Sequence, residues 1–238
     1  YSITFLMKAV NGKPVSGQNL RQVVDYAKVM ADFHRFGDRF SEESGRVMGG
    51  KAARTSVFGI IQSELPEIQT ELERYYKDLF TPDEQRILNG AFCHLERKQK
   101  AISEIRFKKT HIHGDFRLCH VFEVDDQISG IVDFDESCFA ERVIDICFGM
   151  ISAPKQNDGK VLNVEQQRIF LETYHQHYPL TGDEVDVLAD LLIWSNLEQL
   201  LDLCSYLKNN VEAVTEEKLS SNVEEILLLM ENPFFNLT

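Results

Sequence analysis

The sequence predicts a mainly α-helical protein with a small β insertion near the middle of its 238 residues, an α+β arrangement. Long stretches on both sides of the middle repeat apolar residues at helical spacing, as between Asn19 and Phe36. Helix-start signals open several of these stretches. Between them lie the short β-type runs KTHI, VFEV and ISGIVDF, with a DDQ turn between the last two. We therefore expect helices to build most of the core.

In the first 80 residues, the pattern predicts one strand and two helices. Residues 2–7, SITFLM, are β-branched and aromatic, which is typical of a buried strand, and a connector, NGKP, follows at 11–14. Apolar positions in residues 19–36 predict an amphipathic helix that ends near Gly37. A further helix is expected over residues 66–79.

The next helix has the clearest start signal in the chain. Thr81 can cap it, Pro82 occupies the first helical position, and Glu84 can complete a capping box. This helix should run to about Ile105, and helices should resume after the insertion near Glu141. The remaining predicted helices begin at Asn163, at the TGDE box of residues 181–184 and at about Thr215.

The chain is acidic, with a formal net charge of −13 and a hydrophobic fraction of 43%. Binding of nucleic-acid phosphates needs clustered Lys and Arg, so this charge argues against a nucleic-acid partner. It is compatible with a cationic small molecule or a metal ion, or with an acidic surface that only serves solubility. No apolar run approaches the roughly 18 residues that span a membrane, so no membrane partner is expected.

The five cysteines show no CxxC spacing. Their odd number, in a chain that is not small, does not suggest a disulfide framework. Reduced thiols in a cytoplasmic protein are the simplest account, because disulfides are rare in that compartment.

Two segments of the insertion carry the residues that could do chemistry. In THIHGDFRLCHVF, His111, His113 and Asp115 alternate, and His120 follows. The second segment, IVDFDE, places Asp133 after the predicted turn. Phosphoryl transfer from a nucleotide needs a carboxylate that orients the attacking hydroxyl, and ligands that hold Mg²⁺ against the phosphates. Asp115, His120 and Asp133 supply such a set at the ends of neighbouring strands.

The run HGDFRLCHVF, followed by GIVDFDESCFAERVIDI, resembles the aminoglycoside phosphotransferase and choline kinase superfamily, whose fold is similar to that of protein kinases. The resemblance implies that Asp115 is the catalytic base. It implies that His120, where the family usually has Asn, and Asp133 are ligands of Mg²⁺. Asp145 matches a later family Asp that braces the catalytic loop, and His113 is expected to be a hydrogen-bonding scaffold residue.

The resemblance extends to the N-terminal part of the sequence. ITFLMKAVNGKPV is similar to the hinge strand of such kinases, with backbone groups at Lys8 and Val10 facing the adenine, and VMADFHRF resembles the following helix, with His34 near its end. Residues 1–10 would then be the hinge strand from an N-terminal lobe that is missing from this sequence. Residues 11–238 would be the helical C-terminal catalytic lobe.

The implied activity is transfer of the γ-phosphoryl group of ATP or GTP, with Mg²⁺, to a hydroxyl group of a small, amine-bearing acceptor. Aminoglycosides, choline-like alcohols and amino alcohols all stay open as acceptors. Glu198 and Asp202, at i and i+4 of a predicted helix, are either a solvated face or part of an acceptor site.

Two other interpretations stay open. A catalytically inactive binding module with the same fold would tolerate His120 in place of Asn, and the absence of the lobe that covers the phosphates leaves the activity of this chain alone undecided. A metal-dependent hydrolase would use His111, His113 and Asp115, because His-x-His-x-Asp opens the zinc motif of metallo-β-lactamase-like hydrolases. Those enzymes have His directly after the Asp, where this chain has Phe116, and their fold is a strand-rich sandwich.

Overall fold

The computed structural model describes residues 10–17, 19–39, 57–152, 164–209 and 215–231. In these ranges the chain is mainly helical and its strands are short, which confirms the predicted fold class. The strand expected at residues 2–7 and the helix start expected at Asn163 lie outside the described residues.

The helices are α1 (Leu20–Gly37), α2 (Val57–Glu71), α3 (Pro82–Glu104), α4 (Val143–Ser152), α5 (Val164–His177), α6 (Gly182–Asp186), α7 (Leu188–Lys208) and α8 (Glu216–Glu231). The strands are β1 (Lys13–Pro14), β2 (Lys109–Ile112), β3 (Val121–Val124), β4 (Gln127–Ile131) and β5 (Cys138–Glu141). A π-helical turn (Leu72–Tyr76) and two 3₁₀ turns (Lys77–Leu79 and Leu118–His120) complete the described elements.

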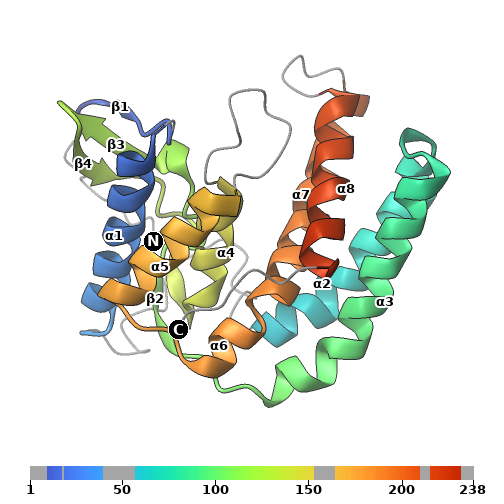
Figure 1. The fold of residues 1–238 in the computed structure, drawn as a ribbon, viewed down its shortest axis with the longest axis horizontal. Helices are drawn as coiled ribbons and strands as arrows, with labels where there is room; N and C mark the ends of the chain where they lie inside the picture. Colours follow the sequence, from blue (N-terminus) through green and yellow to red (C-terminus); the bar gives the residue numbers. More distant parts are fainter. Residues whose placement is uncertain (1–9, 18, 40–56, 153–163, 210–214, 232–238) are drawn as a thin grey trace, which may run out of the picture.

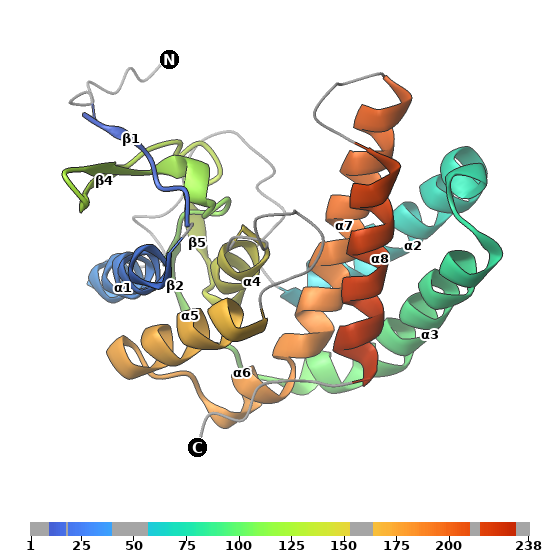
Figure 2. The same cartoon turned by 45° about the horizontal axis from the view of Figure 1, so that its top comes forward.

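The elements form two packed groups that share a hydrophobic core. Helices α1 and α5 and the strands lie on one side, and α2, α3, α7 and α8 form a bundle on the other (Figure 1). Helix α4 lies between the groups and packs against both α5 and α7. The second view shows the same division (Figure 2). Both chemically interesting segments of the sequence lie among the strands of the first group.

The described strands form two small antiparallel sheets. β1, β3 and β4 make one sheet, whereas β2 pairs with β5 so that Ile112 lies opposite Cys138. Asp125 and Asp126, both with positive φ, form the tight turn between β3 and β4, as the DDQ signal predicted. β5 was not predicted, because its four residues carry no alternating pattern and depend on pairing with a distant strand.

Helix α1 is fixed at both of its ends. Asn19 Oδ1 accepts a hydrogen bond from the N–H of Gln22 and so caps the N-terminus. At the other end, a Cβ on Gly37 would lie only 2.6 Å from Thr110 Oγ1, so glycine is needed for the close approach of α1 to β2. Thr110 Oγ1 donates to the carbonyl of His34 at 2.8 Å. The end of α1 therefore packs directly on the strand that leads to the HGDF segment.

The helix predicted over residues 66–79 starts earlier and is not uniform, so this prediction was wrong in both respects. Helix α2 contains Pro66 in its interior. A proline there lacks an N–H and crowds the preceding turn, at a cost of roughly 3 kcal/mol. Ile61, Leu65 and Ile68 are buried at helical spacing across the proline, and their burial offsets that cost. The segment then ends in the π-helical and 3₁₀ turns rather than in a continuing α-helix.

Both predicted capping boxes are present. Thr81 Oγ1 accepts from the N–H of Glu84, and the Glu84 carboxylate accepts from the N–H of Thr81. Thr181 and Glu184 make the same reciprocal pair at the start of α6. These local hydrogen bonds explain why the two helices begin where the sequence indicated.

Arg142, directly after β5, forms a fully buried bidentate ion pair with Glu184. The guanidinium also donates to the carbonyl of Pro179 and lies over the ring of Tyr178. Burial alone would raise the pKa of Glu184, but the hydrogen bonds from Arg142 and from the N–H of Thr181 lower it overall. The pair ties the β2–β5 sheet to α6.

Glu184→Gln should leave the buried Arg142 guanidinium without an anionic partner and lower the free energy of unfolding at pH 7 by roughly 3–5 kcal/mol. Because the pKa of folded Glu184 is lowered, its contribution is complete above the ordinary carboxyl pKa of about 4.3 and is lost as the pH falls through the lowered value. The difference between the two proteins should therefore shrink in acid. Urea denaturation across this pH range measures it.

The matched control is Glu172→Gln, which removes one partner of the exposed pair with Arg168. This change should cost no more than about 1 kcal/mol. Equal losses in the two variants would contradict a special contribution of the buried pair.

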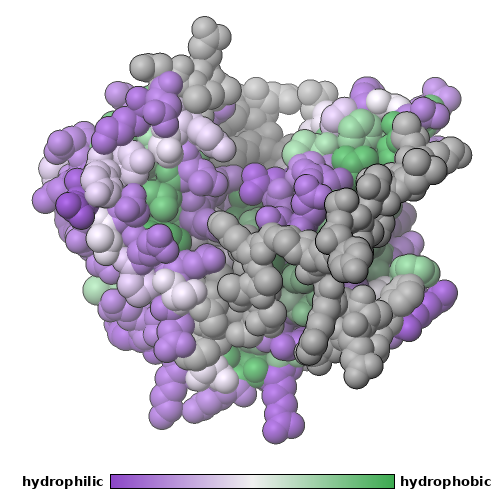
Figure 3. Space-filling model, turned by 180° about the vertical axis from the view of Figure 1, so that it is seen from behind, coloured by the Kyte–Doolittle hydropathy of each residue, from purple (hydrophilic) through white to green (hydrophobic). Residues whose placement is uncertain are grey.

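The described surface seen from behind is largely hydrophilic (Figure 3). Within the described ranges, no helix combines the length and the apolar character needed to cross a membrane. All five cysteines are free thiols. Burial raises the pKa of the Cys204 thiol to about 12, which keeps that thiol protonated and unreactive at neutral pH.

Candidate active site

The HGDF segment forms a tight loop directly after β2. Gly114 has a φ of +85°, a left-handed conformation that favours glycine. A Cβ on Gly114 would lie 2.2 Å from the carbonyl oxygen of Glu136, so no side chain fits there. Farther along, the N–H of Leu118 donates to Ser152 Oγ at 2.8 Å, which attaches the segment to α4. The loop therefore crosses the IVDFDE segment, and the two motifs meet.

The Asp145 carboxylate on α4 holds this loop in place. Its Oδ2 accepts from the N–H of His113 at 2.7 Å, and its Oδ1 accepts from the N–H of Gly114 at 2.8 Å. Oδ2 also lies 2.9 Å from Nε2 of His34 on α1. The side chains of Asp145, His34 and His113 are fully buried, so no water can replace a lost partner. These hydrogen bonds form the brace that the resemblance implied for Asp145.

His34 connects the Asp145 brace to a further helix. Its Nδ1 lies 2.8 Å from the hydroxyl of Tyr174 on α5. Burial raises the pKa of Tyr174 well above its ordinary value, so the hydroxyl keeps its proton and can donate to Nδ1. The VMADFHRF resemblance places His34 near the end of a helix but implies no contact for its side chain. Its place on the buried face of α1 was the signal that could have suggested one.

The ring of His113 joins the loop to the end of β4. Its Nδ1 accepts from the N–H of Asp115 at 3.3 Å, and its Nε2 faces the carbonyl of Val132 at 2.8 Å. Because a carbonyl only accepts, the hydrogen bonds assign the Nε2–H tautomer. Both nitrogens are therefore engaged, as expected for a scaffold residue. This engagement, together with the helical fold, counts against the hydrolase interpretation that used His111, His113 and Asp115 as metal ligands.

Asp115 lies where the loop reaches solvent, and 28% of its side-chain surface is exposed. Arg117 Nε lies 2.5 Å from Asp115 Oδ1 and forms an ion pair with it, but the N–H does not point at this oxygen well enough to make a hydrogen bond. Asp115 Oδ2 lies 3.8 Å from Nδ1 of His120. A carboxylate in this position is accessible to a small molecule while a neighbouring cation compensates its charge.

His120 and Asp133 form the other half of the site. His120 Nδ1 lies 2.9 Å from the carbonyl oxygen of Asp115 and must donate to it, so in the neutral ring the lone pair is on Nε2. That Nε2 lies 3.3 Å from Asp133 Oδ2. Asp133 has a φ of +68°, a left-handed conformation that is uncommon for residues other than glycine and that directs its side chain from the end of the β3–β4 hairpin.

The structure thus brings Asp115, His120 and Asp133 together, as the sequence predicted. Of the two residues expected at the adenine, Lys8 lies outside the described residues. Val10 is described and is half-buried beside β4, and its contact with a nucleotide stays a prediction.

His120 and Asp133 fit the donor set of a divalent cation bound together with phosphates. In the part of the chain that is described, no group of three or more His, Cys, Asp or Glu side chains is arranged to hold an ion. Mg²⁺ at phosphoryl-transfer sites takes one or two protein ligands, and phosphates and water complete its shell. A ring N–H donated to a backbone carbonyl, as in His120, is also the outer contact typical of a metal-ligating histidine.

A small cleft of about 100 Å³ opens beside this site. The HGDF loop, α4 and α7 line it with Arg117, Phe148, Ile151, Ser152, Ser195, Glu198, Gln199 and Asp202. The sequence left open whether Glu198 and Asp202 form a solvated face or part of an acceptor site. In the structure they line the same cleft as Arg117 of the HGDF loop. No local signal could have paired this helix with the loop, because they are far apart in the sequence.

A family model described as "Phosphotransferase enzyme family" matches residues 2–181 of this chain. No curated protein matches the chain in sequence.

Several solved structures are similar to this chain at low sequence identity. The GDP complex of aminoglycoside 2'-phosphotransferase-IIIa is 13% identical with a TM-score of 0.60, and the match covers 95% of this chain and 70% of that chain. An amicoumacin kinase in complex with AMP-PNP and Ca²⁺ is 13% identical with a TM-score of 0.59, and the match covers 94% of this chain and 63% of that chain. A microcompartment-associated aminopropanol kinase is 15% identical with a TM-score of 0.66, and the match covers 95% of this chain and 66% of that chain. The chain therefore spans roughly two thirds of their length, and the similarity concerns the fold.

Asp145→Asn should lower the free energy of unfolding by roughly 2–4 kcal/mol, because one carboxylate oxygen becomes an NH₂ group facing a buried donor. Urea denaturation measures the loss. Amide hydrogen exchange at His113 and Gly114 should also become faster, since their N–H groups lose an acceptor.

Asp32→Asn is the matched control, because Asp32 is exposed and pairs only at the surface with Arg35. It should change stability by no more than about 1 kcal/mol. Unchanged exchange at His113 and Gly114 in Asp145→Asn would show that Asp145 does not hold the loop.

Proposed function

Because the chain belongs to the phosphotransferase enzyme family, we propose that it transfers the γ-phosphoryl group of a nucleoside triphosphate to a hydroxyl group of a small, amine-bearing molecule. The observation that carries this proposal is the convergence of Asp115, His120 and Asp133. A part-exposed carboxylate, an imidazole and a second carboxylate lie together at the strand ends. Phosphoryl transfer uses a carboxylate that orients the attacking hydroxyl and side chains that hold the metal ion against the phosphates.

In the proposed reaction, Asp115 accepts a hydrogen bond from the acceptor hydroxyl. As the hydroxyl oxygen attacks the γ-phosphorus, its proton passes to the Asp115 carboxylate. The new oxygen–phosphorus bond forms while the bond to the β–γ bridging oxygen breaks, and the nucleoside diphosphate leaves with that electron pair. Arg117 lies beside Asp115 and compensates the negative charge of the carboxylate before the reaction.

We propose that His120 and Asp133 hold Mg²⁺, which when bound orients the donor phosphates and compensates their charge. The Asp115 carbonyl fixes the ring of His120, so its Nε2 stays directed at Asp133. The printed descriptions of the similar structures include GDP, and AMP-PNP with Ca²⁺, which supports use of a nucleotide and a divalent cation.

The acceptor is proposed to bind in the cleft lined by Glu198 and Asp202. Two carboxylates on one wall favour a cationic amine over a neutral or anionic acceptor. The similar structures include an aminoglycoside phosphotransferase and an aminopropanol kinase, which agrees with an amine-bearing alcohol. Aminoglycosides, choline-like alcohols and amino alcohols are all compatible with this charge.

We further propose that residues 1–10 form the hinge strand and contact the adenine through backbone groups of Lys8 and Val10, and that residues 11–238 are the catalytic lobe. Either ATP or GTP can use backbone contacts of this kind. We place the protein in the cytoplasm, where its free cysteines stay reduced.

The test is an assay of the intact protein with ATP or GTP, Mg²⁺ and a panel of amine-bearing alcohols, with mass spectrometry of the phosphorylated product. Asp115→Ala should lower kcat by roughly 10²- to 10⁴-fold, as expected for the loss of a positioned general base. Nucleotide affinity should change little, because Asp115 faces the acceptor.

Asp32→Ala, which removes an exposed carboxylate from α1, should keep normal turnover. Near-normal turnover by Asp115→Ala would remove Asp115 from the mechanism. If the unaltered protein bound nucleotide but formed no product from any acceptor, the inactive binding module would be the better interpretation.

Asp133→Asn should lower activity through weaker cation binding, and activity should partly recover with high Mg²⁺ or with Mn²⁺, which accepts nitrogen ligands more readily. His120→Asn should be tolerated, because an amide oxygen suits Mg²⁺. Initial rates measured over a cation titration decide both cases. Inactivity of a folded His120→Asn variant at every cation concentration would mean that His120 does not act as a metal ligand.

A further inference from the structure

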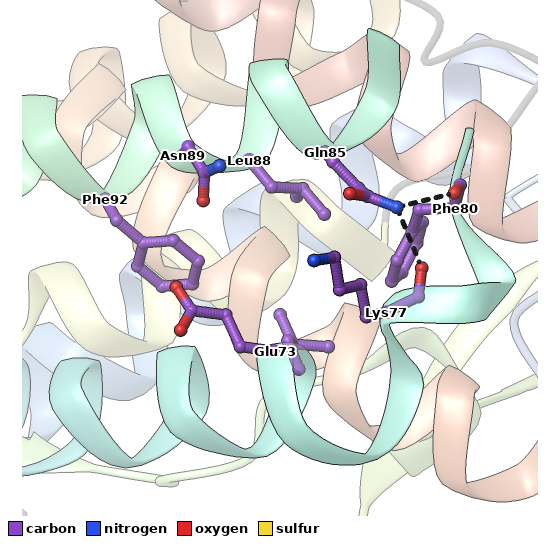
Figure 4. Close-up of a pocket in the computed structure, with 8 residues that line it drawn as sticks. Glu73, Lys77, Phe80, Gln85, Leu88, Asn89 and Phe92 are labelled. Atoms are coloured by element: carbon purple, nitrogen blue, oxygen red, sulfur yellow. Dashed lines mark hydrogen bonds between the residues drawn. The ribbon is translucent and has the colours of Figure 1, made fainter. Parts of the chain in front are cut away.

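A larger cavity lies in the helical bundle, away from the catalytic loop. Its volume is about 340 Å³, which falls in the range of small-molecule pockets. The π-helical and 3₁₀ turns after α2 form one wall, and the first half of α3 forms the other (Figure 4). Helix α3 lies at the opposite edge of the molecule from α1 and the β3–β4 hairpin (Figure 1). The proposed phosphoryl transfer uses none of the cavity's residues.

The floor of the cavity is apolar. Leu72, Phe80, Leu88 and Phe92 line it and are almost completely buried. The amide group of Gln85 donates to the carbonyls of Lys77 and Phe80, which fixes the turn between the two walls. The floor is therefore part of the rigid core and exists without a ligand.

Two opposite charges face this cavity without pairing. Glu73 and Lys77 point into the same space under α3, with Asn89 opposite them (Figure 4). At i and i+4 of an α-helix these residues would be neighbours that form an ion pair. Here the π-helical turn at Leu72–Tyr76 and the 3₁₀ turn that follows change the rotation between them. Within the described residues neither has an ion pair, and Glu73 has only a hydrogen bond from Gln69.

We infer that this cavity binds a free α-amino acid with an apolar side chain. The ammonium group would pair with Glu73, the carboxylate with Lys77, and the side chain would cover Leu72, Leu88 and Phe92. Glu73 and Lys77 are exposed at the rim of the cavity, so a ligand with one charge of each sign would pair with both at once, whereas an anion or a cation alone would pair with only one of them. The apolar floor supplies the remaining affinity through burial of hydrocarbon surface.

The test is isothermal titration of the full chain with L-leucine, compared with three probes that each lack one feature. Compared with leucine, 3-methylbutylamine lacks the carboxylate, 4-methylpentanoate lacks the ammonium group, and glycine lacks the apolar side chain. Leucine should bind with a Kd of about 1 mM or lower, and each probe at least about tenfold more weakly. Absence of saturable leucine binding, or equal binding of all four molecules, would overturn the inference.

Two variants assign the binding to this cavity. Lys77→Met and Glu73→Gln should each weaken leucine binding at least about tenfold. The matched controls Lys100→Met and Glu96→Gln change exposed residues of α3 that do not line the cavity, and they should bind as the unaltered chain does. Equal affinity in Lys77→Met and in its control would place the leucine elsewhere. Because binding is measured without nucleotide or acceptor, the result does not depend on the proposed phosphoryl transfer.

Discussion

The hydrogen bonds that converge on the buried Asp145 carboxylate are the constraint on which the candidate active site depends. They fix two successive N–H groups of the HGDF loop, at His113 and Gly114. The same carboxylate contacts His34, which contacts Tyr174, so the loop is attached to α1, α4 and α5 at once. Because no water reaches these groups, each depends on its protein partners. The position of Asp115 is therefore set by the packed core rather than by the loop itself.

Two stacked histidines show how backbone contacts give identical side chains different chemistry. The rings of His113 and His120 lie 5.8 Å apart. The carbonyl of Val132 holds the proton of His113 on Nε2, and both of its nitrogens are then used. The carbonyl of Asp115 holds a proton of His120 on Nδ1, and Nε2 faces Asp133. One imidazole supports the loop, and the other faces Asp133, where we propose that a cation binds.

The two halves of the fold contribute different parts of the proposed reaction. The strand ends supply the groups proposed for the donor phosphates and their cation, and α7 in the bundle supplies Glu198 and Asp202 for the acceptor. Helix α4 joins the halves, since it carries Asp145 under the loop and Phe148 in the cleft. The buried pair of Arg142 and Glu184 joins β5 to α6 and does not line the cleft. It contributes to the stability of the scaffold.

The sequence by itself determined the features that depend on near neighbours. Capping boxes, the DDQ turn and helical apolar spacing act within a few residues, and the spacing of Asp115, His120 and Asp133 marked the site because the motif is compact. Only the tertiary structure decided β5, the helix that continues through Pro66, the contacts of His34 and the acidic cleft. Each of these rests on contacts between segments far apart in the chain or on burial that outweighs a local preference. No local pattern records such contacts, because they arise only when the helices pack.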